Sequence, residues 1–269
     1  QVQTGTDRGD ILTISLQSSA PTNLGSYASI GPTRAALAAA QSPAVNSTTD
    51  AEDITLSSKG SSTTVAIAAQ DSAKTAAAKI NALTHITSVE ADAETLAHLF
   101  STNASAANYT ISLNGSSTSA FSISSSDVTD AISKINLISA TTGVHASATA
   151  DNKVLLVDSD GDDITVENTA AGSDLDIQAV ERDGTTTQGG AISLADGGST
   201  NNDATRVIGS LRLFSSDSFS IVQSGSSSTA YATSGTPTLT SLANVDLSSA
   251  RNAASAVAVI DGALEQLIT

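Results

Sequence analysis

Three aspartates spaced two residues apart could bind a calcium ion. Asp158, Asp160 and Asp162 occupy positions 1, 3 and 5 of an EF-hand-like pattern, in which carboxylate oxygens converge on the ion. The pattern then fails, because position 6 is not glycine and position 12 is not glutamate. The alternative is a hairpin turn between strands at 153–157 and 164–168, in which Asp and Gly supply the turn conformations. The hairpin is the favoured interpretation, and the three aspartates are the only calcium candidates.

A second group of side chains could contact a carbohydrate. Arg206 and Arg212 are six residues apart and could share a strand face, and Tyr109 and Tyr231 are two of the chain's three tyrosines. A polyanionic ligand would need such a local cationic groove, or bridging calcium, because the chain as a whole is strongly acidic. The alternative is a solvated scatter of charges without a binding site.

Motifs for catalysis are absent from the sequence. It has no cysteine, no G-x-S-x-G nucleophile elbow, no phosphate-binding G-x-x-x-x-G-K and no H-E-x-x-H. The three histidines, His85, His98 and His145, are scattered, and exposed polar positions are expected for them. The sequence therefore indicates a protein that is not an enzyme and that needs no cofactor.

Composition narrows the class of protein further. The 269 residues include 11 Lys+Arg and 27 Asp+Glu, which gives a formal charge of −16, and 39% of the residues are hydrophobic. Such a charge repels nucleic acid and anionic membranes, and no apolar run is long enough to cross a bilayer. The apolar residues fall in patterned runs, so a folded domain is expected. Because the chain has no methionine, we expect it to be part of a longer translation product.

The clearest predicted element is a C-terminal helix. Apolar residues recur every three or four positions from 250 to 267, which places them in a heptad-like stripe on one helix face. Such a stripe needs a partner, either its own domain or a helix from the other end of the chain. The expected packing residues are Ala253, Val257, Ile260, Leu264 and Leu267.

The remaining elements are shorter. Residues 32–41, PTRAALAAAQ, are expected to form a helix with proline at its first position. Residues 90–100, EADAETLAHLF, are also expected to be helical, whereas ILTISL (11–16) fits a strand or a helical turn. Most strands are expected between about residues 53 and 222, where short runs alternate apolar and polar side chains.

An internal repeat links two parts of this β-rich region. KINALTHITSVEADA (79–93) aligns without gaps on KINLISATTGVHASA (134–148). Each copy is expected to form two strands and then a helix, capped by Asp71 in the first copy and by Asp127 in the second. Two copies are too few for a solenoid, so the pattern predicts a duplicated module.

The repeat and the C-terminal tail resemble bacterial flagellin. Ile80-Asn81 and Ile135-Asn136 are similar to the Ile-Asn pair after which a flagellin module is named. The continuation KVLLVDSDGDDITVEN resembles the hairpin that closes this module, and VDLSSARNAASAVAVIDGALEQLIT is similar to the start of the C-terminal flagellin helix. VQTGT is a weaker match to the end of the N-terminal helix, and residues 5–50 match the family poorly.

The resemblance implies an elongated α+β protein. The two chain ends, residues 1–50 and 235–269, would form a discontinuous helical stem. Residues 51–234 would form an inserted β-rich outer region, with the two Ile-Asn type modules at about 54–105 and 108–170. The implied function is that of a structural subunit of the bacterial flagellar filament. The chain would be a truncated, non-polymerising form, since other subunits bind through the stem and through terminal helices that are missing here.

The family also includes homologues on the cell surface that bind the acidic polysaccharide alginate. The resemblance therefore implies an alternative function, that of a flagellin-like surface receptor or adhesin for alginate. Either function implies an extracellular location, on the flagellum or the cell surface, without nucleic acid as a partner and without insertion into a membrane. A Cys-free sequence with Ser/Thr-rich loops suits such a solvated outer surface.

Overall fold

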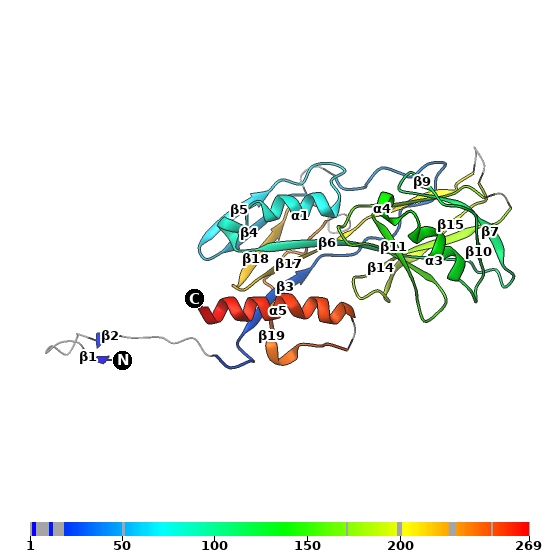
Figure 1. The fold of residues 1–269 in the computed structure, drawn as a ribbon. Helices are drawn as coiled ribbons and strands as arrows, with labels where there is room; N and C mark the ends of the chain where they lie inside the picture. The colour runs from blue at the N-terminus through cyan, green and yellow to red at the C-terminus, as the bar shows by residue number, and fades with distance from the viewer. Residues whose placement is uncertain are drawn as a thin grey trace. The chain divides into compact units, whose positions relative to one another are not determined.

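The computed structural model describes residues 2–3, 11–12, 19–49, 52–170, 172–197, 201–225, 230–248 and 250–268. Strands dominate and helices are few (Figure 1), which confirms a β-rich fold of mixed class. The chain divides into two compact units, one of residues 1–26 and 239–269 and one of residues 27–238. Of the predicted helical stem, the described part of the chain contains the C-terminal helix, and no residue described before Ala73 is helical.

The first unit contains one long helix, α5 (Ala250–Ile268), and several short elements. These are β1 (Val2–Gln3), β2 (Ile11–Leu12), β19 (Leu239–Ser241) and the 3-10 turn η1 (Leu242–Asn244). Helix α5 packs on the backbone near Gly25, whose N–H donates to Gln266 Oε1 at 2.9 Å. A Cβ atom at Gly262 would lie 2.6 Å from the Gly25 carbonyl oxygen, so this approach requires the glycine inside the helix.

The second unit is built around the central strand β6 (Glu90–Phe100), which pairs antiparallel with three other strands. These are β12 (Val154–Asp158), β14 (Leu175–Val180) and β17 (Ser210–Ser215). They continue the sheet to β11 (Val144–Ala148), β15 (Thr187–Leu194) and β3 (Gly25–Ile30), respectively.

The helix predicted for residues 90–100 is therefore wrong. Alanine, leucine and glutamate have high helix propensity, but propensity is a weak prior that tertiary contacts override. In β6 the alternate residues Ala91, Ala93, Ala97 and Leu99 are buried, which is the two-residue period of a strand. Small alanines let this strand pass through the middle of the unit.

Three smaller sheets complete the second unit. The first contains β16 (Ala204–Val207), β13 (Ile164–Asn168), β8 (Ile111–Leu113) and β9 (Ser116–Ser117). The others contain β18 (Phe219–Gln223) with β4 (Ile54–Ser58) and β5 (Ser61–Val65), and β7 (Ala107–Tyr109) with β10 (Phe121–Ile123). Because β12 and β13 belong to different sheets, the predicted hairpin between them is wrong, and the DSDGDD segment crosses from one sheet to another.

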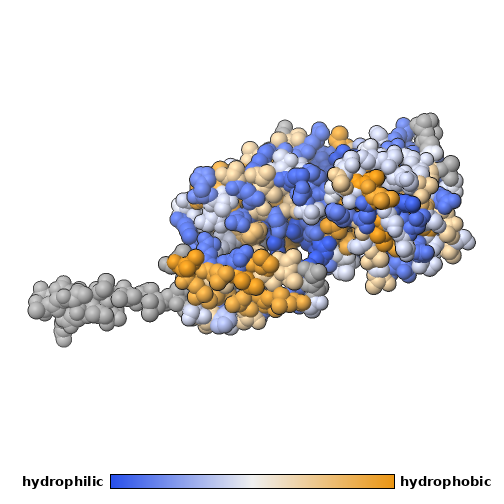
Figure 2. All heavy atoms as spheres, in the orientation of Figure 1, coloured by the Kyte–Doolittle hydropathy of each residue, from blue (hydrophilic) through white to orange (hydrophobic). Residues whose placement is uncertain are grey.

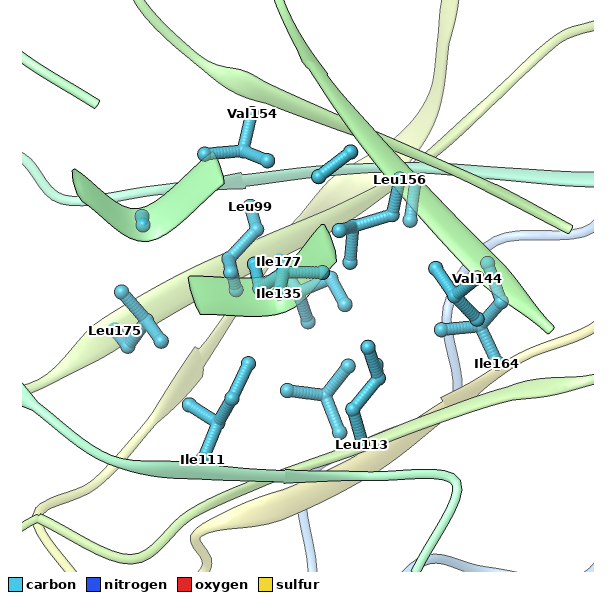
Figure 3. Close-up of a cluster of buried hydrophobic side chains, with 14 of the residues drawn as sticks. Leu99, Ile111, Leu113, Ile135, Val144, Val154, Leu156, Ile164, Leu175 and Ile177 are labelled. Atoms are coloured by element: carbon cyan, nitrogen blue, oxygen red, sulfur yellow. The ribbon is translucent and has the colours of Figure 1, made fainter. Parts of the chain in front are cut away.

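The second unit has two hydrophobic cores. One includes Ile135 together with Leu99, Ile111, Leu113 and Leu156, whose side chains gather in Figure 3. The other includes Ile80 together with Ile54, Leu56, Leu211 and Ile221. Each copy of the Ile-Asn pair thus supplies a fully buried isoleucine to a different core.

The two repeat copies fold alike. The first contains α1 (Ala73–Asn81) and α2 (Thr84–Thr87), and the second contains α3 (Thr129–Asn136) and α4 (Ser139–Thr142). Asn81 Nδ2 donates to the Ala91 carbonyl, and Asn81 Oδ1 accepts from the Ala91 N–H, both at 2.8 Å. Asn136 forms the same pair of bonds with Ala146, at 2.9 and 2.8 Å. In each copy the asparagine side chain is therefore hydrogen-bonded to the backbone of the strand that follows the helix pair.

Helix capping differs from the expectation in both copies. The N-cap of α1 is Ser72, whose hydroxyl accepts from the Thr75 N–H, so the prediction of Asp71 is wrong. Asp71 instead binds Lys79 at 2.5 Å. In the second copy the N-cap of α3 is Val128, which makes no side-chain cap bond, so the prediction of Asp127 as the cap is also wrong. Asp127, one residue earlier, accepts from the Thr129 N–H at 2.9 Å.

The helix predicted for residues 32–41 is also wrong. This segment runs extended beside β16, where the Leu37 N–H donates to the Arg206 carbonyl at 2.9 Å. Ala40 and Ala204 exchange two backbone bonds, at 2.9 and 3.0 Å. Bonds to a neighbouring strand replace the intrahelical bonds that an alanine-rich sequence favours. For ILTISL, residues 11–12 form β2 and the others lie outside the described residues.

We expect Asn81→Ala and Asn136→Ala each to lower the free energy of unfolding by about 1–2 kcal/mol, because each removes two hydrogen bonds to a strand backbone. Urea denaturation measures both losses. Asn103→Ala, at an exposed loop position, is the matched control and should change stability by less than about 0.5 kcal/mol. Equal stability of all three variants and the wild type would show that these asparagine hydrogen bonds do not stabilise the fold.

Candidate functional site

The largest apolar side chains of α5 face solvent. Val257, Ile260, Leu264 and Leu267 are 56%, 41%, 56% and 57% exposed, and Ala253 beside them is partly exposed. Figure 2 shows hydrophobic side chains gathered over this helix. These are the five residues that the heptad spacing predicted as packing positions.

A different set of α5 residues packs within the first unit. Ala256, Val259 and Ala263 are at most 8% exposed, and Gly262 lies against the Gly25 carbonyl. The inward residues are thus mostly small, and the outward stripe is mostly large and branched. The helix therefore has two adjacent apolar faces, of which its own unit covers one.

Burying the second face would be strongly favourable. Full burial of a valine, leucine or isoleucine side chain contributes about 1.5–3 kcal/mol, so the four half-exposed side chains have several kcal/mol left to gain. Residues spaced three and four apart form a stripe that another helix can cover by knobs-into-holes packing. We call Val257, Ile260, Leu264 and Leu267 the outer stripe of α5.

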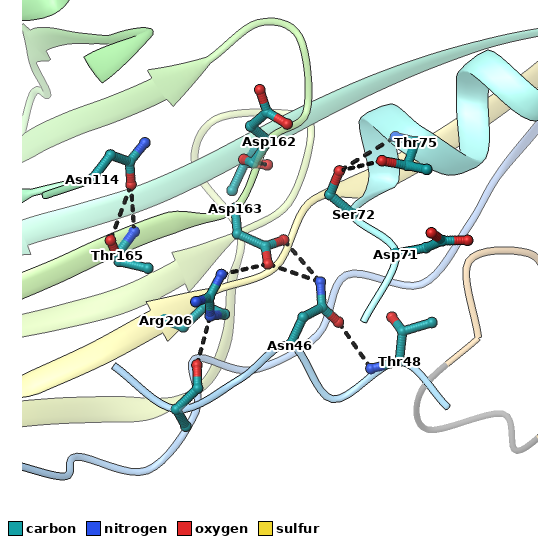
Figure 4. Close-up of polar contacts among 12 residues, drawn as sticks. Asn46, Thr48, Asp71, Ser72, Thr75, Asn114, Asp162, Asp163, Thr165 and Arg206 are labelled. Carbon is teal, nitrogen blue, oxygen red and sulfur yellow. Dashed lines mark hydrogen bonds and ion pairs between the residues drawn. The ribbon is translucent and has the colours of Figure 1, made fainter. Parts of the chain in front are cut away.

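The predicted ligand residue Arg206 lies in a buried polar network (Figure 4). Its Nη1 and the Nδ2 of Asn46 both donate to Asp163 Oδ2 at 2.8 Å, and its Nε donates to the Ala44 carbonyl at 2.6 Å. Burial raises the pKa of Asp163, against the opposing effect of the two donors. Arg206 thus fixes residues 44–46 against β13 and β16.

Tyr231 belongs to the same region and is buried. Its hydroxyl donates to the Asp71 carbonyl at 2.6 Å, and the Arg34 guanidinium carbon lies 4.3 Å from its ring centroid. Arg34 also donates to Thr48 Oγ1 at 2.8 Å and lies 3.9 Å from Glu52. The aromatic ring is therefore part of the interior and offers no surface to a sugar.

Arg212 and Tyr109 lie elsewhere in the second unit. Arg212 on β17 binds Asp92 on β6 at 2.5 Å, and Arg182 binds the other oxygen of the same carboxylate at 2.7 Å. Tyr109 is buried against Phe121, with ring centroids 6.1 Å apart. Arg206 and Arg212 lie on strands that do not pair with each other. The structure does not bring the four predicted ligand residues into one site.

The three calcium candidates also do not converge. Asp158 is buried, and its Oδ1 accepts backbone N–H groups of Asp160, Gly161 and Asp162 at 3.0–3.2 Å. Lys74 binds Asp160 at 3.2 Å and Asp162 at 2.8 Å. Among the residues that the structure describes, no group of three or more acidic, histidine or cysteine side chains could hold a metal ion.

The histidines divide into two kinds. His85 and His145 are exposed, as predicted, whereas His98 on β6 is only 3% exposed, so its predicted exposure is wrong. The error follows from the wrong secondary structure of residues 90–100, because a strand in the middle of a sheet can bury both of its faces.

Sequence analysis missed a groove of about 420 Å³ between the β4–β5 turn and β18. Six of its ten lining residues are serines, and Lys59, which pairs with Asp217 at 2.6 Å, also lines it. The run LSSKGSS is the only sequence signal for this feature.

None of the described helices is long and apolar enough to span a membrane. No model of a known protein family matches the chain, and no curated protein matches it significantly.

Proposed function

We propose that the chain is part of a flagellin-type filament subunit that assembles through the outer stripe of α5. The observation that supports this proposal is the distribution of apolar side chains around α5. The small Ala256 and Ala263 face inward, while the large Val257 and Leu264 face outward. A helix that served only its own unit would bury its largest apolar side chains. The outer stripe is therefore an interface that is completed by another helix.

In this proposal the partners are helices of neighbouring flagellin subunits, outside the cell. The first unit supplies the assembly interface. The second unit, with its two modules, supplies the outer region, whose Ser- and Thr-rich, acidic surface faces solvent. A strongly negative outer surface keeps subunits from associating at other places.

The absence of cysteine from the sequence allows a direct test. We expect Val257→Cys to cross-link two chains rapidly with a short bis-maleimide, because the outer stripe brings two copies of α5 together at high protein concentration. Glu265→Cys, exposed on another side of the same helix, is the matched control and should cross-link at least tenfold more slowly. Reaction with a monofunctional maleimide confirms that both thiols are equally accessible.

Serine at Val257, Ile260 and Leu264 should abolish the concentration-dependent increase in sedimentation coefficient shown by the wild type. Leu137→Ser, at a 75% exposed leucine of the second unit, should leave this increase unchanged. A wild type that sediments as a strict monomer at all concentrations, together with equal cross-linking of the two cysteine variants, would sink the proposal.

The alternative proposal is a surface receptor or adhesin for alginate. The two arginines predicted to bind the polysaccharide are already paired with carboxylates of the chain, Arg206 with Asp163 and Arg212 with Asp92. The chain would then have to bind the polysaccharide through other residues. Saturable, alginate-selective binding that persists in the triple serine variant would favour the receptor over the filament subunit.

A further inference from the structure

The two copies of the duplicated module differ in their first hairpin. ITL (54–56) on β4 aligns with ISL (111–113) on β8, so Leu56 and Leu113 are equivalent. In the second copy the turn follows directly after the pair Leu113–Ser116. In the first copy the hairpin continues past Leu56–Thr63 by two further pairs, which consist entirely of serine: Ser57–Ser62 and Ser58–Ser61. We call these four serines the hairpin extension.

The hairpin extension lines the groove between the β4–β5 turn and β18 (Figure 1). Ser57 and Ser62 hydroxyls lie 2.8 Å apart across the strands, and Ser58 Oγ donates to the Ser218 carbonyl at 3.2 Å. Ser218 and Ser220 are the other two serines of the lining. The volume of about 420 Å³ falls within the range of small-molecule sites, about 300–1,000 Å³. The residues that distinguish the first copy thus create a polar hollow of ligand size.

The turn that closes the extension carries a charged side chain at the groove. Lys59 and Gly60 have φ angles of 49° and 79°, the left-handed conformation that a two-residue hairpin turn requires. Lys59 pairs with Asp217 at 2.6 Å, and its side chain is 58% exposed. The equivalent turn residue of the second copy, Asn114, bonds to β13, since its N–H donates to the Thr165 carbonyl and its Oδ1 accepts from the Thr165 N–H. The first hairpin therefore presents its turn to solvent, whereas the second is held against a strand.

The lining determines which ligand the groove suits. Each serine hydroxyl both donates and accepts hydrogen bonds, so six of them match a molecule that is itself covered with hydroxyls. The ammonium of Lys59 and the carboxylate of Asp217 have opposite charges, so the pair favours neither an anion nor a cation. Phe219 has the largest apolar side chain of the lining and is only 2% exposed, so a hydrophobic ligand would find little to contact. A neutral sugar ring satisfies all three conditions.

We propose that the groove beside the hairpin extension is a binding site for a neutral saccharide. The hydroxyls of the sugar replace water at the serine hydroxyls and at the exposed turn. Each such exchange contributes little net free energy, and the groove exposes no aromatic ring for stacking, so a dissociation constant of about 1 mM is expected. The groove uses no residue of the first unit. Its success or failure as a sugar site is therefore independent of assembly through α5.

An NMR titration of the whole chain tests the proposal. The probes are methyl α-glucoside, methyl α-mannoside and methyl β-galactoside, each added up to about 50 mM, well above the expected dissociation constant. At least one should cause saturable shifts of the Gly60, Ser62 and Ser220 amides. The amides of Ser116 and Ser117, in the equivalent hairpin of the second copy, should not shift and serve as an internal control. Glucuronate and glucosamine should bind no more tightly, because each meets one like charge of the Lys59–Asp217 pair.

Two tyrosine variants locate the site. Ser62→Tyr places a ring in the groove and should weaken binding by about tenfold or more. Thr64→Tyr is the matched control: Thr64 lies two residues further along β5 on the same face, where its hydroxyl contacts Thr55 as Ser62 contacts Ser57, and it is not part of the lining. Its affinity should stay within about twofold of the wild type.

Should Ser62→Tyr fail to fold, the titration of the wild type decides, with the second hairpin as its control. The proposal would be overturned by the absence of saturable shifts with all three glycosides, by equal shifts in both hairpins, by tighter binding of either charged sugar, or by equal affinities of the two tyrosine variants.

Discussion

Ile135→Ala is expected to lower the free energy of unfolding by about 2–5 kcal/mol, which is among the largest losses that a single substitution causes. Ile135 is fully buried in the core that also contains Leu99, Ile111 and Leu156. Removing three carbon atoms there loses the transfer free energy and leaves a cavity between α3 and the sheets. Equilibrium urea denaturation measures the loss.

The repeat supplies a second variant for comparison. Ile80 is the equivalent residue of the first module, is also fully buried, and belongs to the other core. Ile80→Ala should therefore cost about as much as Ile135→Ala, and because the two residues are in separate clusters the losses should add in the double variant within about 0.5 kcal/mol. Leu137→Ala, two residues from Ile135 and 75% exposed, should change stability by less than about 0.5 kcal/mol.

A loss below about 1 kcal/mol for both isoleucines would contradict their role as closely packed members of the two cores. A double variant whose loss differs from the sum of the two single losses by more than about 0.5 kcal/mol would show that the two isoleucine sites interact.

Local patterns predicted the parts of the fold that local contacts stabilise. The duplicated KIN segments could be recognised because the isoleucine and the asparagine each have a fixed task, one in a core and one in a bond to a nearby strand. The C-terminal helix could be recognised because its apolar residues recur regularly every three or four positions. Its exposed face could not be deduced, because spacing shows that a partner exists but not whether the partner lies in the same unit.

The errors occurred where distant strands decide the structure. Residues 32–41 and 90–100 are rich in helix-forming residues, but both pair with strands far away in the sequence, and no local pattern encodes that pairing. The same reason explains why the four predicted ligand residues do not lie in one site. The arginines were grouped by their spacing along the chain, whereas their carboxylate partners, Asp163 just before β13 and Asp92 on β6, are distant in the sequence.

Asp163→Ala is expected to cost about 3 kcal/mol, the lower end of the range for breaking a buried ion pair, since Arg206 keeps some exposure to solvent. The substitution leaves the Arg206 guanidinium without its carboxylate, and leaves Asn46 Nδ2 with the Tyr231 hydroxyl, 3.4 Å away, as its acceptor. Both changes loosen residues 44–46, so faster amide exchange in this segment should accompany the lower stability.

Asp160→Ala is the matched control, because it removes a carboxylate three residues away that also forms an ion pair. Asp160 is 69% exposed and shares Lys74 with Asp162, so its loss should cost less than about 0.5 kcal/mol. Asp163→Asn should fall between the two, because an amide can still accept from Arg206 but cannot neutralise it. Since burial raises the pKa of Asp163, the folded chain binds that proton more tightly than the unfolded chain. The wild type should therefore gain stability relative to Asp163→Asn as the pH falls through the raised pKa of this carboxyl, which urea denaturation at a series of pH values measures. Equal losses for Asp163→Ala and Asp160→Ala would show that the network contributes no more than a surface pair.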